Sequence, residues 1–274
     1  MDVTRTFAGT RVVVTGAGGI FGRRIAAAFA KAGARLCLYD PRPEILERLP
    51  GELGLARDAT LLHATELRQD GSILDLVRLV ERAWGAPDVL INNAGVYPRG
   101  HLLDIPADEW DRIMDVNLRA PFLLTREMAR LMIGAGVRGS VVNITSGAAR
   151  NVRTGSVPYS TSKAALERLT AGLALELARH RIRVNAVSPG FAPGSTVSPL
   201  SPSYVEAILS RIPLGRASGP DDAPSAILFL CSAQASFITG ATLAVDGGNS
   251  LGTIDSPAGS TGGPLGSAAA GPTS

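Results

Sequence analysis

The segment PYSTSKAAL (158–166) contains a tyrosine and a lysine whose spacing suits acid–base chemistry. Tyr159 and Lys163 are four positions apart at the start of a helical pattern, so their Cβ atoms lie about 5–6 Å apart on one face. The pKa of a free phenol is about 10, and a nearby ammonium favours the phenolate. We therefore expect Tyr159 to act as a general acid/base, although the same spacing is also common on solvated helix faces.

Lysine is rare in this chain, which favours a specific role for Lys163. Only Lys31 and Lys163 are lysines among 27 basic residues, and the rest are arginines. A compact ammonium with three donors can bond to ribose hydroxyls while it perturbs a phenol, whereas a guanidinium is bulkier and differently shaped.

Further polar residues follow apolar strand-like runs. Ser146 comes just after SVVNIT, 13 positions before Tyr159, and INNAG (91–95) ends another such run. Strand ends in parallel sheets face the ligand crevice, so a hydroxyl there can bond to a reacting oxygen opposite the phenol. Asn117 lies in MDVNL, inside a long helical pattern, where a polar amide calls for a reason.

A glycine-rich turn links the first predicted strand to the first predicted helix. VVVTGAGGIFGRRIA places Gly16, Gly19 and Gly22 between them. Free amides and the helix dipole at such a turn bind a pyrophosphate, and the missing side chains let it come close. The strand–glycine–helix context favours dinucleotide binding over a tight turn without a ligand.

The second predicted strand ends in Asp40, 24 positions after Gly16. A carboxylate there accepts hydrogen bonds from the adenine ribose and repels the 2′-phosphate of NADP. Arg42 lies two residues on, and an arginine near this turn can hold that phosphate. We expect NAD rather than NADP; a plain turn residue before Pro41 is the alternative reading of Asp40.

Short apolar runs alternate with helical patterns along the chain. The strand-like runs span 11–15, 35–39, 60–63, 88–92, 140–144, 183–187 and 242–246. Near-continuous apolar runs predict strands that are covered on both faces. Helical spacing is clearest over 107–134 and 158–180. The alternation predicts an α/β fold with a parallel, doubly wound sheet of about seven strands and helices on both faces.

One domain is expected over residues 1–250. The remainder, 251–274, is rich in Gly, Ser, Pro and Ala and is expected to form a flexible tail. Cys37 and Cys231 lie in apolar runs and are interpreted as buried thiols, and the three histidines show no metal-ligand spacing, so we expect no metal site.

Several partner classes are not expected. The net charge is +3 with scattered arginines, which disfavours nucleic-acid binding. The apolar runs are shorter than the ~18 residues of a membrane span, and MDVTRTFAGT lacks the core of a signal peptide. A cytoplasmic location is the resulting expectation.

Taken together, the motifs resemble the short-chain dehydrogenase/reductase family, in its single-domain form of roughly 250 residues with a Rossmann-type fold. They occur in order from Arg11 to about Gly248: TGAGGIFG, NNAG, DVNL, NITS, YSTSK, VNAVSPG, IPLGR and TGATLAVDGG. The resemblance implies a catalytic tetrad of Asn117, Ser146, Tyr159 and Lys163. Tyrosine exchanges a proton with the substrate oxygen, serine polarises that oxygen, lysine lowers the tyrosine pKa and holds the ribose, and asparagine keeps a water.

The same resemblance implies the cofactor contacts. They are Gly16, Gly19, Ile20, Gly22, Asp40, Glu66, Leu67, Asn93, Tyr159, Lys163, Pro189 and Gly190. Ile20 stands where the family usually has its second glycine, and the resulting TGxxGxxG spacing is familiar from epimerase-like members with a larger substrate domain. Glu66 replaces an aspartate. Gly194 stands about where the family often has a threonine. Either Ser195 or Thr196 replaces the bond of that threonine to the nicotinamide amide, or no residue does.

The substrate region is expected to include a lid at about 191–212, with further walls from Tyr97, Pro98, Arg99 and the loop 147–158. Arg99, Arg150 and Arg153 either favour an anionic substrate or face solvent or another subunit. The two long helices are apolar beyond one face, which indicates helix-on-helix association. The resemblance implies a homotetramer or homodimer.

We therefore expect an NAD-dependent oxidoreductase that interconverts a secondary alcohol and a ketone. One alternative is an NADPH-dependent 3-oxoacyl-carrier-protein reductase, with Arg138, His180 and Arg181 near helix ends where an acidic carrier could dock. An alternative of another class is a nucleotide-binding regulatory protein without turnover. Retention of Tyr159 and Lys163 disfavours it, and the family's varied substrates leave the substrate open.

Overall fold

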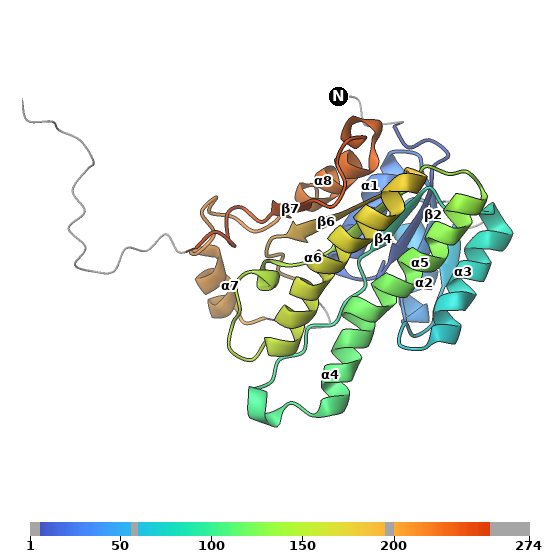
Figure 1. The fold of residues 1–274 in the computed structure, drawn as a ribbon. Helices are drawn as coiled ribbons and strands as arrows, with labels where there is room; N and C mark the ends of the chain where they lie inside the picture. The colour runs from blue at the N-terminus through green and yellow to red at the C-terminus, as the bar shows by residue number, and fades with distance from the viewer. Residues whose placement is uncertain (1–5, 56–59, 195–199, 253–274) are drawn as a thin grey trace, which may run out of the picture.

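The computed structural model describes residues 6–55, 60–194 and 200–252. A sheet of seven strands in the order β3-β2-β1-β4-β5-β6-β7 forms its centre (Figure 1), and every strand pair is parallel. The strands are β1 (Arg11–Thr15), β2 (Arg35–Tyr39), β3 (Leu61–His63), β4 (Val89–Asn92), β5 (Ser140–Ile144), β6 (Arg183–Pro189) and β7 (Thr242–Val245). The predicted single doubly wound sheet is confirmed.

Burial explains why the strand sequences are apolar at nearly every position. β4 and β5 are buried along their whole length, and β1 is buried from Val12 onward. In the centre of the sheet, Val13 pairs with Cys37 of β2 and with Leu90 of β4. Strands covered on both faces bury both sets of alternating side chains, so no polar face remains in the sequence.

Two layers of helices cover the sheet (Figure 1). One core joins the sheet to helices α1, α2 and α8 through side chains such as Phe29, Leu49 and Ile227. The other core joins it to α3, α5 and α6 through Leu76 and Met128 among others. The helices are α1 (Ile20–Lys31), α2 (Pro43–Glu52), α3 (Asp70–Trp84), α4 (Ala107–Met114), α5 (Ala120–Gly134), α6 (Val157–Leu177), α7 (Pro202–Leu209) and α8 (Asp222–Cys231).

The single helix predicted over 107–134 is interrupted. Helix α4 ends at Met114, a π-helical turn spans Asp115–Arg119, and α5 begins at Ala120. The turn is centred on Asn117, which is completely buried. A π-turn inserts one residue into the helical ladder and frequently marks a functional site, and periodicity alone did not show it.

Other expectations concern the periphery of the fold. None of the helices within the described ranges has the length and apolarity to cross a bilayer. Cys37 and Cys231 are free cysteines, and burial raises the pKa of each thiol to about 12. Helix α7 supplies the short helical stretch expected in the lid, whereas lid residues 195–199 and the tail from residue 253 lie outside the described residues.

Candidate active site

The predicted site residues gather at the carboxyl edge of the sheet. β1 leads into the glycine loop, β2 into Asp40, β4 into Asn93 and β5 into Ser146. The order in which strands are added to the sheet reverses between β1 and β4, which are neighbours although β2 follows β1 in sequence. Ligands of open α/β sheets bind in the crevice outside this switch point. The topology therefore places the predicted residues where the fold forms its crevice.

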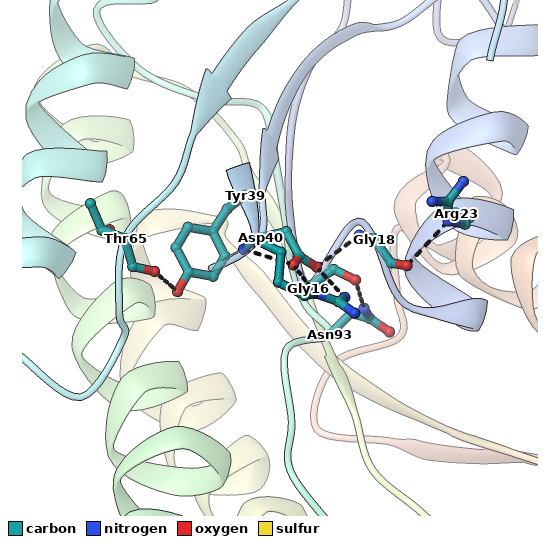
Figure 2. Close-up of polar contacts among 8 residues, drawn as sticks. Gly16, Gly18, Arg23, Tyr39, Asp40, Thr65 and Asn93 are labelled. Carbon is teal, nitrogen blue, oxygen red and sulfur yellow. Dashed lines mark hydrogen bonds and ion pairs between the residues drawn. The ribbon is translucent and has the colours of Figure 1, made fainter. Parts of the chain in front are cut away.

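Asn93 fastens the end of β4 to the beginning of the glycine loop (Figure 2). Its Nδ2 donates to the carbonyls of Thr15 and Gly16 at 2.9 and 3.0 Å. A Cβ on Gly16 would lie 2.8 Å from the Cα of Ala94, and Gly16 has a φ of +65°. Glycine is required here by both the close approach and the backbone conformation. Asn93 thus shapes the floor of the crevice through the protein backbone.

Helix α1 presents unpaired amides at the mouth of the glycine loop. Gly19 is its N-cap and offers no side-chain cap, and Arg23 is the first residue whose amide bonds one turn back, to Gly19. The amides of Ile20, Phe21 and Gly22 therefore have no partner within the helix. They and the helix dipole suit a pyrophosphate.

The glycines keep this helix start open and compact. A Cβ on Gly22 would lie 2.0 Å from the carbonyl oxygen of Gly16, so the helix packs directly on the loop. On Gly19 the nearest atom to a Cβ would be that same oxygen at 3.4 Å. Ile20 is half-buried and simply opens α1. The loop closes with isoleucine in place of the usual glycine, and its residues fit a dinucleotide.

Asp40 is buried at the end of β2, and its carboxylate is fully engaged. Oδ2 accepts the Gly18 amide at 2.9 Å (Figure 2) and Nη2 of Arg42 at 3.1 Å. Oδ1 accepts Nε of Arg42 at 2.7 Å and the Arg42 amide at 3.2 Å. A carboxylate has about four lone-pair sites, so a ribose hydroxyl must displace part of Arg42 to reach Asp40. The sequence reasoning placed the two residues together but did not foresee this ion pair.

The expected adenine side of the crevice lies beyond β3. The Tyr39 hydroxyl donates to the Thr65 carbonyl (Figure 2), which holds the segment after β3 against β2. Leu67 is buried and Glu66 is exposed. Burial, together with the charges of Glu66 and Asp40, raises the pKa of Tyr39, so the phenol stays neutral. Leu67 thus anchors this segment and Glu66 remains accessible.

Pro189 and Gly190 end β6 against the last strand. The Gly190 amide donates to the Val245 carbonyl at 2.8 Å. A Cβ on Gly190 would lie 2.8 Å from the Cα of Asp246. This close backbone packing fixes the point where the chain leaves the sheet toward Phe191.

The Ser146 hydroxyl lies near the Tyr159 phenol, close enough for a hydrogen-bonding interaction that favours ionisation of the phenol. Tyr159 lies in the first turn of α6, and Ser146 follows β5. Burial raises the pKa of the Tyr159 phenol, the bond to Ser146 opposes that rise, and Tyr97 adds to it. Two hydroxyls on one crevice wall can share a reacting oxygen, with the phenol as proton donor or acceptor.

Lys163 lies behind Tyr159. Its Nζ is 5.9 Å from the centre of the Tyr159 ring and donates to the Ile144 carbonyl at 2.9 Å. Burial lowers the pKa of the ammonium to about 8. The lysine thus has the expected position below the tyrosine, yet its shortest hydrogen bond goes to the backbone of β5.

Asn117 joins the group through the π-turn. Its Nδ2 donates to Oγ of Ser162 at 3.0 Å and to the Val96 carbonyl at 2.9 Å, while its Oδ1 accepts the Val96 amide at 2.8 Å. A Cβ on Gly95 would lie 3.4 Å from both Oδ1 of Asn117 and Nζ of Lys163. All four residues of the predicted tetrad are therefore neighbours in space.

A buried polar network under the site escaped the sequence reasoning. Asn92 Nδ2 donates to Thr125 at 3.0 Å and to Oδ1 of Asn143 at 2.8 Å, and Nδ2 of Asn143 donates to Thr170 at 2.9 Å. These bonds connect β4 and β5 to α5 and α6. Asparagines at the ends of apolar strands were the available signal, because buried amides need partners.

The chain is similar to known proteins over most of its length. A family model described as enoyl-(acyl carrier protein) reductase matches residues 16–250. The 3-oxoacyl-[acyl-carrier-protein] reductase of Thermotoga maritima is 35% identical over 243 residues, 86% of this chain and 96% of the relative. The gluconate 5-dehydrogenase of Gluconobacter oxydans is 33% identical over 248 residues, 89% of this chain and 95% of the relative.

Solved structures are similar over the same extent. A short-chain type dehydrogenase/reductase from Mycobacterium marinum has a TM-score of 0.81 and 31% identity, covering 90% of this chain and 98% of its own. The 3-ketoacyl-(acyl-carrier-protein) reductase of Brucella melitensis, solved with NADH, has a TM-score of 0.79 and 34% identity, covering 89% and 99%. The likeness spans the whole sheet and the crevice.

Proposed function

The chain belongs to the short-chain dehydrogenase/reductase family, and from that premise we propose that it is an NAD-dependent enzyme interconverting a secondary alcohol and a ketone. Its relatives are oxidoreductases that act on CH–OH groups, and this chain is one as well. The names of those relatives cover carrier-bound oxoacyl chains and gluconate, so family membership alone does not select a substrate.

The convergence of Ser146 and Lys163 on Tyr159 is the observation that carries this proposal, with Nζ of Lys163 5.9 Å from the centre of the Tyr159 ring. Tyr159 donates a proton to a ketone oxygen or removes one from an alcohol, and Ser146 orients that same oxygen. Lys163, buried behind the ring, supplies the positive charge that favours the phenolate. The nicotinamide of a bound cofactor supplies the hydride chemistry.

The crevice offers groups of the right kind for a dinucleotide. The free amides at the start of α1 suit the pyrophosphate. Glu66, and Asp40 once part of Arg42 is displaced, can accept hydrogen bonds from hydroxyl groups on the adenosine side. Residues proposed to hold the cofactor are Gly16, Gly19, Ile20, Gly22, Asp40, Glu66, Leu67, Asn93, Tyr159, Lys163, Pro189 and Gly190.

Charge balance at the end of β2 supports NAD over NADP. Arg42 is the cation nearest the expected ribose, and its guanidinium is neutralised by Asp40 at 2.7 Å. Arg23, the basic residue closest to the loop in sequence, pairs with Glu52. A 2′-phosphate needs an uncompensated positive charge, and neither arginine provides one. Two solved relatives, a 4-hydroxyisoleucine dehydrogenase and the Brucella reductase, contain NADH.

Tyr159→Phe tests the catalytic assignment. The variant keeps the ring and loses the hydroxyl, so turnover of secondary alcohols with NAD should fall by at least about 100-fold. NADH affinity, measured by fluorescence, should change little. Thr161→Ala, an exposed change on the same helix, is the matched control. Near-normal turnover by Tyr159→Phe would remove Tyr159 from the mechanism.

A carrier-bound ketone is the second candidate. Arg138, Arg179, His180 and Arg181 line one surface groove, and this basic surface suits an acidic carrier. However, Tyr159 opens helix α6 and the groove follows its end, so the two lie roughly 30 Å apart at 1.5 Å per residue. A carrier docked there would be far from the crevice, which places this candidate second.

We also propose that the enzyme is a homodimer or homotetramer. Exposed apolar side chains lie on α5 and α6, including Phe122, Ile133 and Leu175. Two others are Phe229 on α8 and Leu243 on β7, the last strand of the sheet. Apolar surface of this kind marks protein–protein contacts. Light scattering of the purified protein measures the assembly directly, and a monomer at micromolar concentration would refute the proposal.

A further inference from the structure

Two arginines from different loops act on one tyrosine at the entrance of the crevice. Nη2 of Arg99 donates to the Tyr204 hydroxyl oxygen at 2.5 Å, and its guanidinium carbon lies 5.2 Å from the centre of the Tyr204 ring. Burial opposes ionisation of this phenol, but the hydrogen bond from Arg99 and the nearby positive charges of Arg99 and Arg153 outweigh it and lower the pKa of Tyr204. The phenol oxygen thus occupies a position that favours negative charge.

The backbone holds these three residues in place. The Gly100 amide donates to the Gly155 carbonyl at 3.1 Å, so the loop after β4 and the loop before α6 are joined beside Arg99 and Arg153. The Arg153 carbonyl accepts Oγ of Ser156 at 2.6 Å at the start of α6. Tyr204 lies in the first turn of α7, capped by Ser201. The cluster is therefore built by three ordered segments.

Among the described residues, neither guanidinium is paired with a carboxylate. Within residues 6–55, 60–194 and 200–252, no ion pair includes Arg99 or Arg153. The neighbouring Arg150, by contrast, approaches Glu167 at 3.9 Å. Two like charges facing one oxygen repel each other, and an anion bound between them relieves that repulsion.

The cluster is linked to the reacting groups by Tyr97. The Tyr97 ring packs edge-on against the Tyr159 ring with centroids 6.3 Å apart, and Arg99 follows two residues later. Ser156, which fixes Arg153, lies three residues before Tyr159 on the same helix start. A substrate whose carbonyl oxygen meets Tyr159 can therefore extend toward the arginines.

Resting on the proposed oxidoreductase function, we propose that Arg99, Arg153 and Tyr204 form a carboxylate-binding subsite and that the substrates are hydroxy acids and their oxo-acid counterparts. The two guanidiniums donate to the carboxylate, and Tyr204 adds its hydroxyl proton. Guanidinium forks match the two oxygens of a carboxylate, and hydrogen bonds to a charged group are the stronger kind. A neutral alcohol gains none of these contacts.

Binding is tested first, without turnover, on the full-length protein saturated with NADH. Glutarate is the probe and glutaramide its neutral counterpart, compared by ligand-observed NMR. Glutarate should bind at least about 10-fold more tightly than glutaramide. Arg99→Gln and Arg153→Gln should each weaken the binding of glutarate by about 10- to 100-fold. Arg150→Gln is the matched control and should leave glutarate binding unchanged.

Turnover is tested with 4-oxopentanoate and its methyl ester, which present the same ketone with and without the charge. The acid-to-ester ratio of kcat/KM should fall by about 10- to 100-fold in Arg99→Gln and Arg153→Gln. Tyr204→Phe, which keeps the ring beneath Arg99, should lower that ratio by a smaller factor. Equal turnover of acid and ester by the unaltered enzyme would overturn the subsite.

The outcomes separate the subsite from the proposed function. Arginine-dependent glutarate binding without turnover of any ketone would refute the proposed function and leave the subsite. Turnover of the neutral ester with no preference for the acid would refute the subsite and leave the proposed function standing. Tighter binding of inorganic phosphate than of glutarate, with the same arginine dependence, would overturn the carboxylate assignment in favour of a phosphate-bearing substrate.

Discussion

Asn117 pairs with Val96 through both of its amide atoms, in the way that a neighbouring strand would. Oδ1 accepts the Val96 amide at 2.8 Å and Nδ2 returns a bond to the Val96 carbonyl at 2.9 Å. β4 ends at Asn92, so Val96 has left the sheet and needs another partner. The π-turn provides it, and the next residue, Tyr97, is thereby held against Tyr159.

Removing this amide should affect both stability and catalysis. Asn117→Ala leaves the Val96 amide and carbonyl without their partner, and we expect a loss of about 2–4 kcal/mol in the free energy of unfolding. Denaturant unfolding measures it, with the exposed Asn151→Ala as control. A loss confined to kcat, with normal unfolding, would contradict the structural role of the Asn117–Val96 pairing. Asn117→Asp should recover part of the stability, because one oxygen still accepts the Val96 amide.

The Asp40–Arg42 pair should control the choice of dinucleotide. Asp40→Ala removes the carboxylate that neutralises Arg42, so NADPH affinity should rise and NADH affinity should fall. The NADH-to-NADPH preference is expected to drop by about 10- to 100-fold. Calorimetry with both cofactors measures this, and Arg48→Ala on the exposed face of α2 serves as control. An unchanged preference would mean that another group selects the cofactor.

The packing of α1 on the glycine loop should tolerate no side chain at Gly22. A methyl group there would meet the Gly16 carbonyl oxygen at 2.0 Å, and such overpacking costs about 1–3 kcal/mol. Gly22→Ala should therefore lower the melting temperature and weaken NADH binding. Gly51→Ala, in helix α2 with no atom within 4 Å of the new methyl group, should leave both unchanged or improve stability slightly. Equal effects of the two changes would show that Gly22 is not needed for close packing.

Burial of Lys163 should give a distinctive dependence of stability on pH. Its pKa is about 8 in the folded protein, below the ordinary value of 10.5. Between these values the unfolded chain binds a proton that the folded chain does not, so this group makes the free energy of unfolding rise with pH. Below pH 8 Lys163 is protonated in both the folded and the unfolded state. Burial of its charge then lowers the free energy of unfolding by its full amount, on the order of 3 kcal/mol.

The comparison with Lys163→Met isolates this group, because the buried cysteines and tyrosines titrate in the opposite sense in both proteins. The unfolding free energy of the unaltered protein, minus that of Lys163→Met, should rise between pH 8 and 10. A difference that stays flat across this range would show that the ammonium is not desolvated.

Apolar periodicity predicted the sheet well because burial on both faces leaves a strong signal. The runs RVVVT and SVVNI coincide with β1 and β5 in full. The parallel direction of the strands followed from the alternation of strands and helices, whereas their order in the sheet was not predicted. The π-turn at Asn117 left no such trace, because a single inserted residue hardly alters the apolar spacing of a long helix.

The sequence predicted which residues would gather at the candidate site, but it did not predict all of the contacts that they make. Motif order brought Ser146, Tyr159 and Lys163 to one edge, because strand ends and helix starts meet there. The contact between Arg99 and Tyr204 joins residues 105 positions apart. Such pairings depend on how loops fold over the crevice, and neither propensity nor periodicity encodes them. The saturation of Asp40 by Arg42 likewise depends on side-chain rotamers.

The hydrogen bond from Gly100 to Gly155 bears on how new specificities arise in this scaffold. This bond joins the loop after β4 to the loop before α6. Replacing only one of the two loops would therefore remove a backbone contact that holds the other loop. Gene shuffling that exchanges both segments together should yield folded, altered enzymes, whereas single-loop chimaeras should mostly lose function. The first third of the chain, which precedes β4, carries the glycine loop and Asp40 and stays outside this pair of loops. Evolution can therefore vary what the enzyme recognises while the cofactor apparatus is kept.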